Sequence, residues 1–482
     1  MNLTLSLGGD GGATAKKRKL RDDVGEGDGG DRARVMRLLQ ARDRVAKVEL
    51  DHQDDHHGGN KQGGEGGLRL MRLLLSSAAA GEVGDTHAAA VALREVYRHA
   101  SFRGADPVQR VAAYFADALA SRLLLPSPKP PPPVPATTRA EQFLALTMFY
   151  QASPMYQFAH FTANQAIVEA FQGSGRRRLH VVDFDVSFGF QWPSLIQSLS
   201  DAAATSSSDD SGDSSGGGEP VSLRITGFGA STDELRDTEA RLSRFADGCP
   251  NLRFEFEGVM NDGPEDGRHD RIKVDPAATV VVNLVFPAAA SSRESRATLE
   301  CIRALGPSLV FLIDKANDGN PAARSRNNNS ASLLPRFACS LRYYAAVFES
   351  LHECLPADSA ERLAIERDHL GVEIGDAMAA SPDHRAADFW TETLERAGFE
   401  GARLSSRTVS QAKLLLKMKS GGCGGGFRVM EDGGDRAMAL GWRDRALIRA
   451  TAWRPCRRSV VGKNASIHSV HRPGQHACTC MT

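Results

Sequence analysis

The sequence predicts an α/β protein whose mainly parallel sheet follows an all-helical N-terminal region. Buried strand patterns alternate with amphipathic helices along the middle of the chain, which is typical of a parallel sheet. These strands are expected at residues 179–184, 221–227, 280–286 and 309–313, with a half-buried strand near 252–256. Later strand patterns at 427–430, 437–442 and 446–453 are separated by short links, which favours antiparallel pairing at this end.

Composition limits the function classes. The 482 residues carry 59 Lys and Arg against 59 Asp and Glu, so a surface that is basic throughout is excluded. A hydrophobic fraction of 41% excludes global disorder. The most apolar stretch, residues 279–290, is too short for a membrane span, and the N-terminus lacks the basic start of a signal peptide. Eight cysteines, mostly far apart, indicate free thiols in a reducing compartment.

Residues 1–67 are expected to be disordered, because this segment mixes glycine with charged residues and has little to bury. It contains one compact basic run, Lys16, Lys17, Arg18 and Lys19. Such a run suits nuclear import or contact with nucleic acid. A charge run that is simply solvated is an equally good interpretation of these four residues.

Helical periodicity dominates residues 68–171. Asp106 followed by Pro107 predicts the start of one helix, whose row Val108, Val111, Phe115 and Leu119 repeats at helical spacing. The proline run 126–135 must be an extended loop, and a further helical segment covers 141–171.

Four details in the second half are also predicted. Residues 200–220, rich in Ser, Asp and Gly, are expected to form a disordered loop. Ser231 and Glu234 have the spacing of a capping box at the start of a helix. Helices are expected from 333 to 399, and residues 413–418 are interpreted as a strand.

The first strand ends in Asp183 and is followed by a turn that contains Gly189. Ligands of open α/β sheets bind beyond the carboxyl ends of strands, where an acid and glycines begin an S-adenosylmethionine or dinucleotide site. Here Val186 and two phenylalanines take positions where a backbone must approach a ligand, and the strand that ends at Gly227 brings no acid. A structural or partner-binding turn is therefore favoured over a nucleotide site.

No catalytic signature stands out: the sequence contains no Gly-x-Ser-x-Gly elbow, Walker loop or His-Glu-x-x-His motif. Lys315 follows a strand end, where a catalytic lysine could sit, but a lysine in a solvated loop is the favoured interpretation. Cys478 and Cys480 lie near several histidines, yet residues 457–482 lack any pattern that would pre-organise metal ligands. We expect a flexible tail there, with no metal and no cofactor.

Several stretches resemble the GRAS family of plant regulatory proteins in the family's order. Leu179, His180, Val181, Val182 and Asp183 resemble its VHIID motif, and the helices near 68–125 and 235–245 resemble its two leucine-rich regions. The PFYRE and SAW regions are represented by Arg342, Tyr343, Tyr344, Glu366, Trp442 and Trp453. Residues 183–199 (DFDVSFGFQWPSLIQSL) look most like the nodulation signalling pathway 2 branch.

This resemblance covers residues 68–456 and implies a Rossmann-like core, related to methyltransferases, in residues 172–456. A helical cap would occupy residues 68–171. Chains of this family usually stop after the SAW region, so residues 457–482 depart from the pattern. The resemblance further implies a nuclear regulator that works through protein partners, with a GRAS protein of the nodulation signalling pathway 1 type as the partner of this branch. DNA would be reached indirectly, and no membrane is involved.

Taken with this resemblance, the sequence predicts a non-enzymatic transcriptional regulator, and the resemblance to the nodulation branch implies symbiosis and strigolactone-related gene control as its setting. Two alternatives remain open: an S-adenosylmethionine-dependent enzyme on the same core, and a direct sequence-specific DNA binder. Tyr114 lies off the main apolar row of its helix. It is expected to belong to a face of the cap that docks a different GRAS protein, although burial within the monomer is the plainer interpretation of any single residue there.

Overall fold

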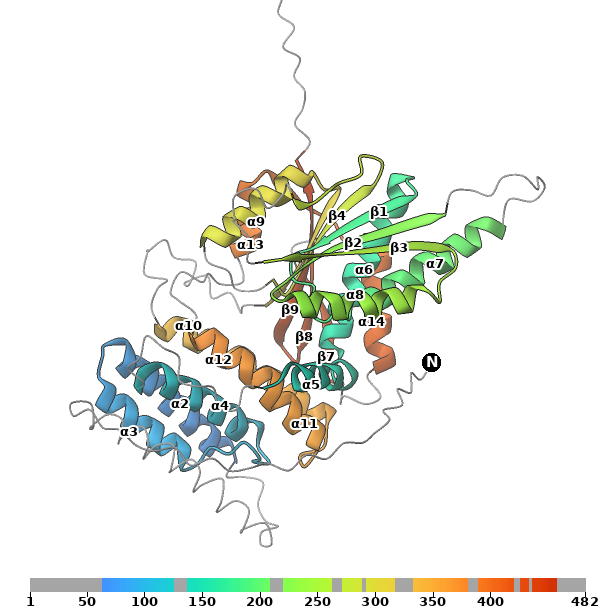
Figure 1. Cartoon of the computed structure of the whole chain (residues 1–482). Coiled ribbons are helices and arrows are strands. Elements are labelled where there is room, and N and C mark those ends of the chain that lie inside the picture. Colours follow the sequence, from blue (N-terminus) through green and yellow to red (C-terminus); the bar gives the residue numbers. More distant parts are fainter. Residues whose placement is uncertain are drawn as a thin grey trace, which may run out of the picture. The chain divides into compact units, whose positions relative to one another are not determined.

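The structure, a computed structural model, describes residues 63–124, 137–208, 220–261, 271–287, 292–316, 333–379, 389–419, 425–432 and 436–456 (Figure 1). The chain divides into two compact units, residues 1–136 and 137–482. Among the described residues, none of the helices combines the length and the apolar character that crossing a bilayer requires. The disordered head with Lys16–Lys19, the proline run and the tail 457–482 lie outside the described residues.

Within the described residues of the first unit, three helices pack on one another: α2 (Gly63–Glu82), α3 (Thr86–Tyr97) and α4 (Pro107–Leu124). Its core is built from leucines and Phe115, which are fully buried. Asp106 caps α4 as expected, because its side chain accepts the Val108 amide at 2.8 Å. A second tie comes from the Tyr97 hydroxyl, which donates to Asp117 at 2.8 Å.

The second unit begins with helices α5 (Arg139–Ala152) and α6 (Pro154–Ser174), which are separated at Ser153 where one continuous helical segment was predicted. Ser153 ends α5 in an extended conformation, and its side chain accepts the Met155 amide to cap α6, which starts with Pro154. Proline suits the first turn of a helix because its missing amide hydrogen needs no partner there. These two helices belong to the same compact unit as the sheet.

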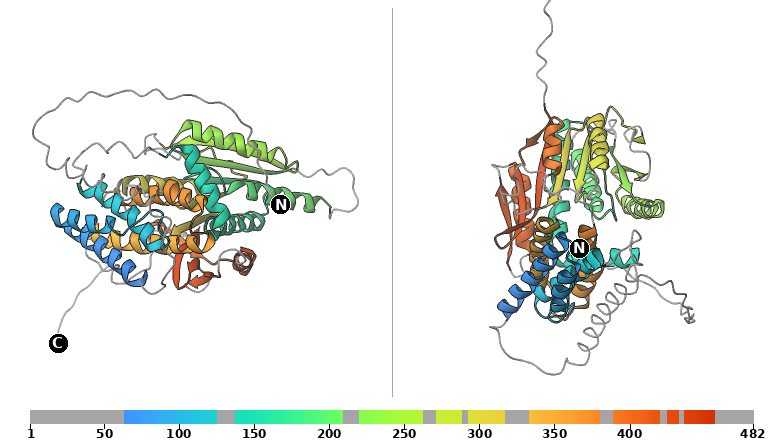
Figure 2. Two further views of the ribbon diagram at one scale, coloured as in Figure 1. Left: turned by 90° about the horizontal axis from the view of Figure 1, so that it is seen from below. Right: turned by 90° about the vertical axis from the view of Figure 1, so that its left-hand side faces the viewer.

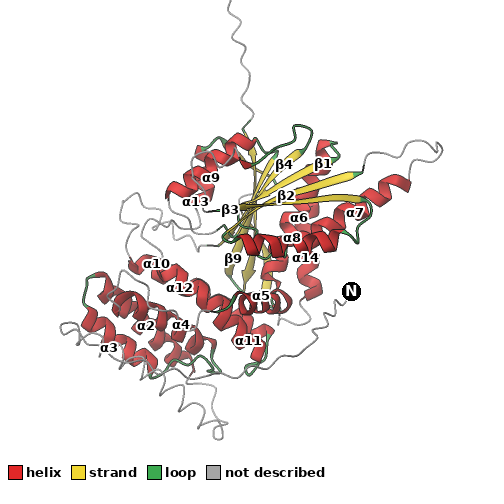
Figure 3. Ribbon diagram, in the orientation of Figure 1, coloured by secondary structure: helices red, strands yellow, loops and turns green. Residues whose placement is uncertain are grey.

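The described residues form a nine-stranded mixed sheet, which confirms the predicted fold class (Figure 3). Its parallel strands have the order β3-β2-β1-β4-β5, the arrangement of a Rossmann-like sheet. They are β1 (Arg178–Asp183), β2 (Val221–Gly229), β3 (Leu252–Met260), β4 (Thr279–Val285) and β5 (Leu309–Lys315). The order reverses between β1 and β4, so the carboxyl ends of these two strands mark the switch point of the sheet.

Antiparallel strands extend the sheet beyond β5, as the C-terminal pattern predicted (Figure 2). They are β6 (Phe399–Ala402), β7 (Phe427–Asp432), β8 (Ala437–Trp442) and β9 (Arg445–Pro455). β9 pairs with β5, β6 and β8, and Arg443 and Asp444 form the tight link from β8 to β9. Thus the last part of the chain completes the same sheet that β1 begins.

Helices cover both faces of the sheet (Figure 3). α7 (Trp192–Ser208) and α8 (Thr232–Ala246) lie on one face with α6 and α14 (Ser406–Lys419). On the other face, α9 (Ser292–Leu305) and α13 (Phe389–Arg396) pack on a buried cluster that includes Val182, Leu312 and Trp453. The remaining elements are α10 (Leu333–Cys354), α11 (Ala360–Ile365), the π-helix η2 (Glu366–Leu370) and α12 (Gly371–Ala379).

Three local predictions were wrong. Residues 413–418 are helical: α14 buries Thr408, Ala412 and Leu416 one turn apart, which the Leu414–Leu416 run concealed. α7 continues to Ser208, into the segment that was expected to be a loop. Ser231 is the N-cap of α8 but makes no side-chain cap hydrogen bond, and Glu234 is paired instead with Arg139.

Candidate functional site

The carboxyl end of β1 is the candidate ligand edge, and the chain's own side chains fill it. Val186 is buried, and its amide donates to the Phe228 carbonyl at 3.0 Å, which holds the turn across the end of β2. Gly227 lies beneath: a β-carbon there would come within 2.9 Å of the Val186 Cβ. The space beside the end of β2 is therefore occupied by a valine side chain.

A closed polar network lies at the switch point, on residues from α6, the turn and β4. The Gln191 amide donates to the side-chain oxygens of Asn164 and Asn283, both at 3.1 Å. In return, Asn283 donates to the Gln191 side-chain oxygen at 3.1 Å, and Asn164 donates to the Gln191 carbonyl at 2.9 Å. All three side chains are buried. Because these amides satisfy one another, the network locks the turn onto the sheet.

The residues at this edge do not fit a nucleoside cofactor such as S-adenosylmethionine. Asp183 is buried, and burial, reinforced by the nearby negative charge of Asp185, raises its pKa to about 7. The end of β2, Gly227-Phe228-Gly229, offers no acid for a ribose. Phe188 and Phe190 of the turn contact Phe143 of α5, with ring centroids 5.4 and 5.2 Å apart. The turn is thus committed to packing within the protein.

The remaining VHIID residues are structural. Leu179, Val181 and Val182 are fully buried in the middle of the sheet. The His180 ring nitrogen Nε2 lies 2.8 Å from the Thr226 hydroxyl of β2. Burial, with a smaller contribution from the positive charge of Arg224, lowers the pKa of His180 to about 4, so the ring is neutral in the folded protein at neutral pH.

A second group, the Lys315 cluster, surrounds the carboxyl end of β5 and contains Lys315, Glu373, Tyr344, His369 and Tyr156. The Lys315 ammonium donates to Glu373 at 2.9 Å and to the Tyr344 hydroxyl at 3.1 Å, and that hydroxyl donates to Glu373 at 3.1 Å. Tyr156 Oη lies 3.1 Å from His369 Nε2. Lys315 is therefore the last residue of a strand and is held in an ion pair, so the expectation of a solvated loop lysine was wrong.

Opposing effects set the charges of this cluster. Burial favours the neutral forms, yet the mutual attraction of Lys315 and Glu373 prevails: the pKa of Lys315 is raised and that of Glu373 is lowered. Burial also lowers the pKa of His369 and, with the Glu373 charge adding to it, raises that of Tyr344. The cluster is an ion pair flanked by neutral rings, with the Lys315 side chain still 39% exposed. Sequence reasoning missed Glu373 and His369, whose i, i+4 spacing carries no signal that points to β5.

Glu366, Trp442 and Trp453 are anchored inside the fold. Glu366 is fully buried at the start of η2, and Arg362 donates to both of its carboxylate oxygens at 3.0 Å. The Trp442 indole donates to Glu349 of α10 at 3.2 Å, which ties β8 to that helix. The Trp453 indole donates to the Thr451 hydroxyl at 2.9 Å. These three motif residues therefore stabilise the fold.

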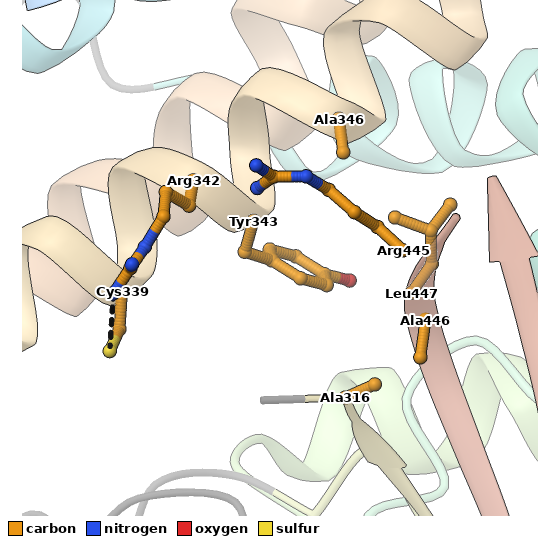
Figure 4. Close-up of a pocket in the computed structure, with 8 residues that line it drawn as sticks. All are labelled: Ala316, Cys339, Arg342, Tyr343, Ala346, Arg445, Ala446 and Leu447. Carbon is orange, nitrogen blue, oxygen red and sulfur yellow. Dashed lines mark hydrogen bonds between the residues drawn. The ribbon is translucent and has the colours of Figure 1, made fainter. Parts of the chain in front are cut away.

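Arg342 and Tyr343 line a pocket between α10 and the start of β9 (Figure 4). The pocket is small, and much of the space in front of it is open to solvent. The lining residues are Ala316, Cys339, Arg342, Tyr343, Ala346, Arg445, Ala446 and Leu447. The two adjacent tyrosines therefore have different surroundings. Tyr343 lines the pocket, whereas the Tyr344 hydroxyl belongs to the Lys315 cluster.

Tyr114 lies in the first unit, on α4. Val111, Phe115 and Leu119 of the main row are fully buried, whereas Tyr114 is half-buried and packs edge-on against Phe102 with ring centroids 4.8 Å apart. Its role toward a partner stays a prediction. The motif residues therefore do not converge on one catalytic centre, and the described residues contain no cluster of three His, Cys, Asp or Glu side chains suited to a metal.

Comparison with known proteins identifies the family of this chain. The GRAS domain family model matches residues 70–454. Protein SLENDER RICE1-LIKE 1 of Oryza sativa is 35% identical over 80% of this chain and 74% of its own length. Protein SCARECROW 2 of Oryza sativa is 34% identical over 82% of this chain, which spans 56% of that relative. Scarecrow-like protein 23 of Arabidopsis thaliana is 31% identical over 81% of this chain and 91% of its own length.

A solved structure shares the fold. The crystal structure of SCL7 in Oryza sativa is similar with a TM-score of 0.61 and 29% sequence identity, over 80% of this chain and 99% of that one. Taken with the family model and the relatives, it shows that the chain belongs to the GRAS domain family of plant regulatory proteins.

Proposed function

We propose that the protein is a nuclear transcriptional regulator that acts by assembling protein complexes and has no enzymatic activity. Membership of the GRAS family supports the regulatory role. The observation that carries the non-enzymatic part is the closed ligand edge, where Val186 lies over Gly227 and the Asn164–Gln191–Asn283 network is satisfied from within. Because side chains of the protein occupy the edge of the sheet where a cofactor would bind, we assign its function to surfaces that contact partner proteins.

The proposed setting is symbiosis, both nodulation and mycorrhiza, together with strigolactone-related gene control. It rests on the resemblance of residues 183–199 to the nodulation signalling pathway 2 branch. The proposed partner is a GRAS protein of the nodulation signalling pathway 1 type, with DNA reached through that partner. Nuclear entry is assigned to the basic run Lys16, Lys17, Arg18 and Lys19.

Recovery of the tagged full chain from plant nuclei, with identification of the co-purifying proteins, tests the proposal. A GRAS partner and transcription components are expected. Two further measurements address the alternatives. Calorimetric binding of S-adenosylmethionine with a micromolar dissociation constant, about −8 kcal/mol, would support an enzyme. Salt-dependent binding of the isolated chain that discriminates between DNA sequences would support a direct DNA binder.

A further inference from the structure

Two large apolar side chains of α14 lie on the protein surface. Leu414 is 54% exposed and Met418 is 70% exposed, whereas Leu416 of the same helix is buried. Residues four positions apart are neighbours on the surface of a helix, so Leu414 and Met418 form one apolar patch. Single exposed apolar residues are common on proteins, but a patch of neighbouring ones is typical of a surface that a partner covers.

The patch lies on the flank of α14 that is turned away from β7. On the β7 side, Lys413 pairs with Glu431 at 2.5 Å. The geometry of an α-helix turns Leu414 about 100° and Met418 about 140° away from Lys413, both in the same sense. Since α14 packs on β7 and along α6, the patch borders α6 (Figure 1).

α6 adds an aromatic ring to this surface. Ser405 and Thr408, at the start of α14, donate to Glu169 of α6 at 2.8 and 3.3 Å. Each helix leads by a short link into a strand, β7 or β1, and these two strands run in opposite directions, so the helices are antiparallel. About two turns from this contact, Phe161 of α6, 36% exposed, therefore lies level with Leu415 of α14.

The charges of these two helices are mainly of one sign. α14 contains Arg407, Lys413, Lys417 and Lys419 and no acidic residue. The one carboxylate of α6 is Glu169, which already accepts the hydrogen bonds from the start of α14. Arg407 and Lys417 are exposed. The surface of α6 and α14 therefore combines apolar side chains with positive charge.

The exposed cations stand next to the apolar patch on the same helix. Arg407 lies two turns before Leu414 on nearly the same line along α14, and Lys417 lies one turn after Leu414. We use the name α6–α14 surface for Phe161, Leu414 and Met418 together with Arg407 and Lys417. A partner that covers the apolar side chains must therefore bring its own polar groups close to both cations.

Charge complementarity selects the partner. A second copy of α14 would bring the same cations, and like charges across an interface repel. A nucleic acid would pair its phosphates with Arg407 and Lys417 but would leave Leu414 and Met418 without an apolar contact. An amphipathic helix with apolar residues on one face and carboxylates beside them matches both features, because its apolar residues recur at the spacing of one helical turn.

We propose that the α6–α14 surface docks an acidic amphipathic helix from a partner protein. Leu414, Met418 and Phe161 contact the apolar face of that helix, and Arg407 and Lys417 pair with its carboxylates. This inference rests on the proposed function only for the premise that the chain recruits partners. Peptide binding is measured independently of the co-purification that tests complex assembly, so the two can fail separately.

The test uses the full chain and the fluorescein-labelled peptide Ser-Asp-Glu-Leu-Leu-Ala-Glu-Leu-Glu-Asp-Leu-Leu-Ala-Glu-Gly, whose leucines recur at helical spacing. Fluorescence polarisation measures binding. One matched peptide carries Asn and Gln in place of Asp and Glu, and a second carries alanine in place of leucine. The full chain should bind the first peptide more tightly than either matched peptide.

Two double variants address the two parts of the surface. Leu414→Gln/Met418→Gln should bind the acidic peptide at least about tenfold more weakly, because the apolar contact is lost. Arg407→Gln/Lys417→Gln should bind it about threefold more weakly and with a smaller dependence on salt, because exposed ion pairs contribute little and are screened.

Control variants make the same changes elsewhere. Leu68 of α2 and Leu144 of α5 are exposed to a similar degree as Leu414, and Arg244 of α8 and Arg303 of α9 are exposed cations. Leu68→Gln/Leu144→Gln and Arg244→Gln/Arg303→Gln should bind the acidic peptide as the unchanged protein does. Thermal midpoints near that of the unchanged protein should show that every variant is folded.

Four results would overturn the proposal. They are no binding of the acidic peptide, equal binding of the three peptides, unaltered binding by Leu414→Gln/Met418→Gln, and equal losses in the control variants. A labelled DNA duplex that binds through Arg407 and Lys417 while the acidic peptide does not would likewise assign the surface to nucleic acid and contradict the proposal.

Discussion

Val186 packs directly on the bare Cα of Gly227, and a β-carbon at residue 227 would come within 2.9 Å of the valine Cβ. This contact joins the turn after β1 to the carboxyl end of β2, where an open α/β sheet usually receives its ligand. The same turn is held by the Val186 amide, which donates to the Phe228 carbonyl. Val186 can therefore cover the carboxyl end of β2 only because residue 227 is a glycine.

The first prediction concerns this contact. Gly227→Ala should destabilise the protein by about 1–3 kcal/mol, because the added methyl group overpacks a buried site. When combined with Gly227→Ala, Val186→Ala should recover only part of that loss, since it removes the valine Cγ1, which lies 3.1 Å from the added carbon, but keeps the Cβ at 2.9 Å. Urea denaturation of the single and double variants measures the coupling.

Gly173→Ala on α6 is the matched control, because a β-carbon there meets nothing within 4 Å. In a helix that change should be neutral or stabilising by up to about 1 kcal/mol. If Gly227→Ala is as well tolerated as Gly173→Ala, the turn is not packed on β2 as described.

The second prediction concerns the buried pair Arg362–Glu366, whose side chains are 3% and 0% exposed. Glu366→Gln should cost about 3–5 kcal/mol, because it leaves a buried guanidinium without its counter-charge. The exposed pair Arg396–Glu392 supplies the comparison, and Glu392→Gln should change the free energy of unfolding by less than about 1 kcal/mol. Similar losses at the two sites would show that Glu366 does not act as a buried counter-ion.

The third prediction concerns pH. His180 has a pKa of about 4 in the folded protein, below its ordinary value of 6.5. As the pH falls, His180 is protonated in the unfolded chain before it is protonated in the folded protein. The free energy of unfolding should therefore decrease as the pH falls from about 6.5 to about 4. The loss should reach about 3 kcal/mol across that interval.

His180→Gln isolates this effect, since glutamine can keep a hydrogen bond to Thr226 but does not titrate. Chemical denaturation at several pH values should give a flatter dependence for the variant than for the unchanged protein. His160, whose pKa burial lowers to about 3, remains in both proteins and cancels in the difference. Parallel curves would contradict a neutral, buried His180.

The parallel strands themselves were largely predictable from the sequence, because β1, β4 and β5 are short, mainly apolar runs and helices separate the strands. Their order in the sheet was not predicted. The strand assigned to residues 413–418 failed for a physical reason. The run Leu414–Leu416 suits a strand locally, but α14 buries Leu416 and leaves Leu414 54% exposed, which follows from its packing on α6 and β7.

The functional residues were harder to predict. Lys315 and Glu373 are 58 positions apart, and no local spacing links them. The pocket likewise joins Arg342 to Arg445 through the packing of α10 on β9, which the sequence does not encode in any short pattern. What the sequence did indicate was the unsuitability of the β1 edge for a cofactor, since the bulky Val186 and the acid-free end of β2 are local features.

The fourth prediction concerns nuclear import. Replacement of Lys16, Lys17, Arg18 and Lys19 by alanine should shift a fluorescent fusion of the full chain from the nucleus to the cytoplasm, because a compact basic run is what import carriers recognise. As a charge-matched control, Arg236, Arg244, Arg303 and Arg396, exposed residues of α8, α9 and α13, are replaced by alanine instead. Unchanged nuclear accumulation after the first replacement would assign import to another segment or to a partner.

The central claim is that this GRAS chain works by forming a complex with a different GRAS protein. Its most direct test is the mass of the assembly that the purified full chain forms with a partner of the nodulation signalling pathway 1 type, measured by light scattering after size exclusion. We predict a stable one-to-one complex with a buried area above about 1,200 Å². Tyr114→Asp should weaken it while the thermal midpoint stays nearly unchanged. Separate elution of the two proteins at concentrations of tens of micromolar would contradict the claim.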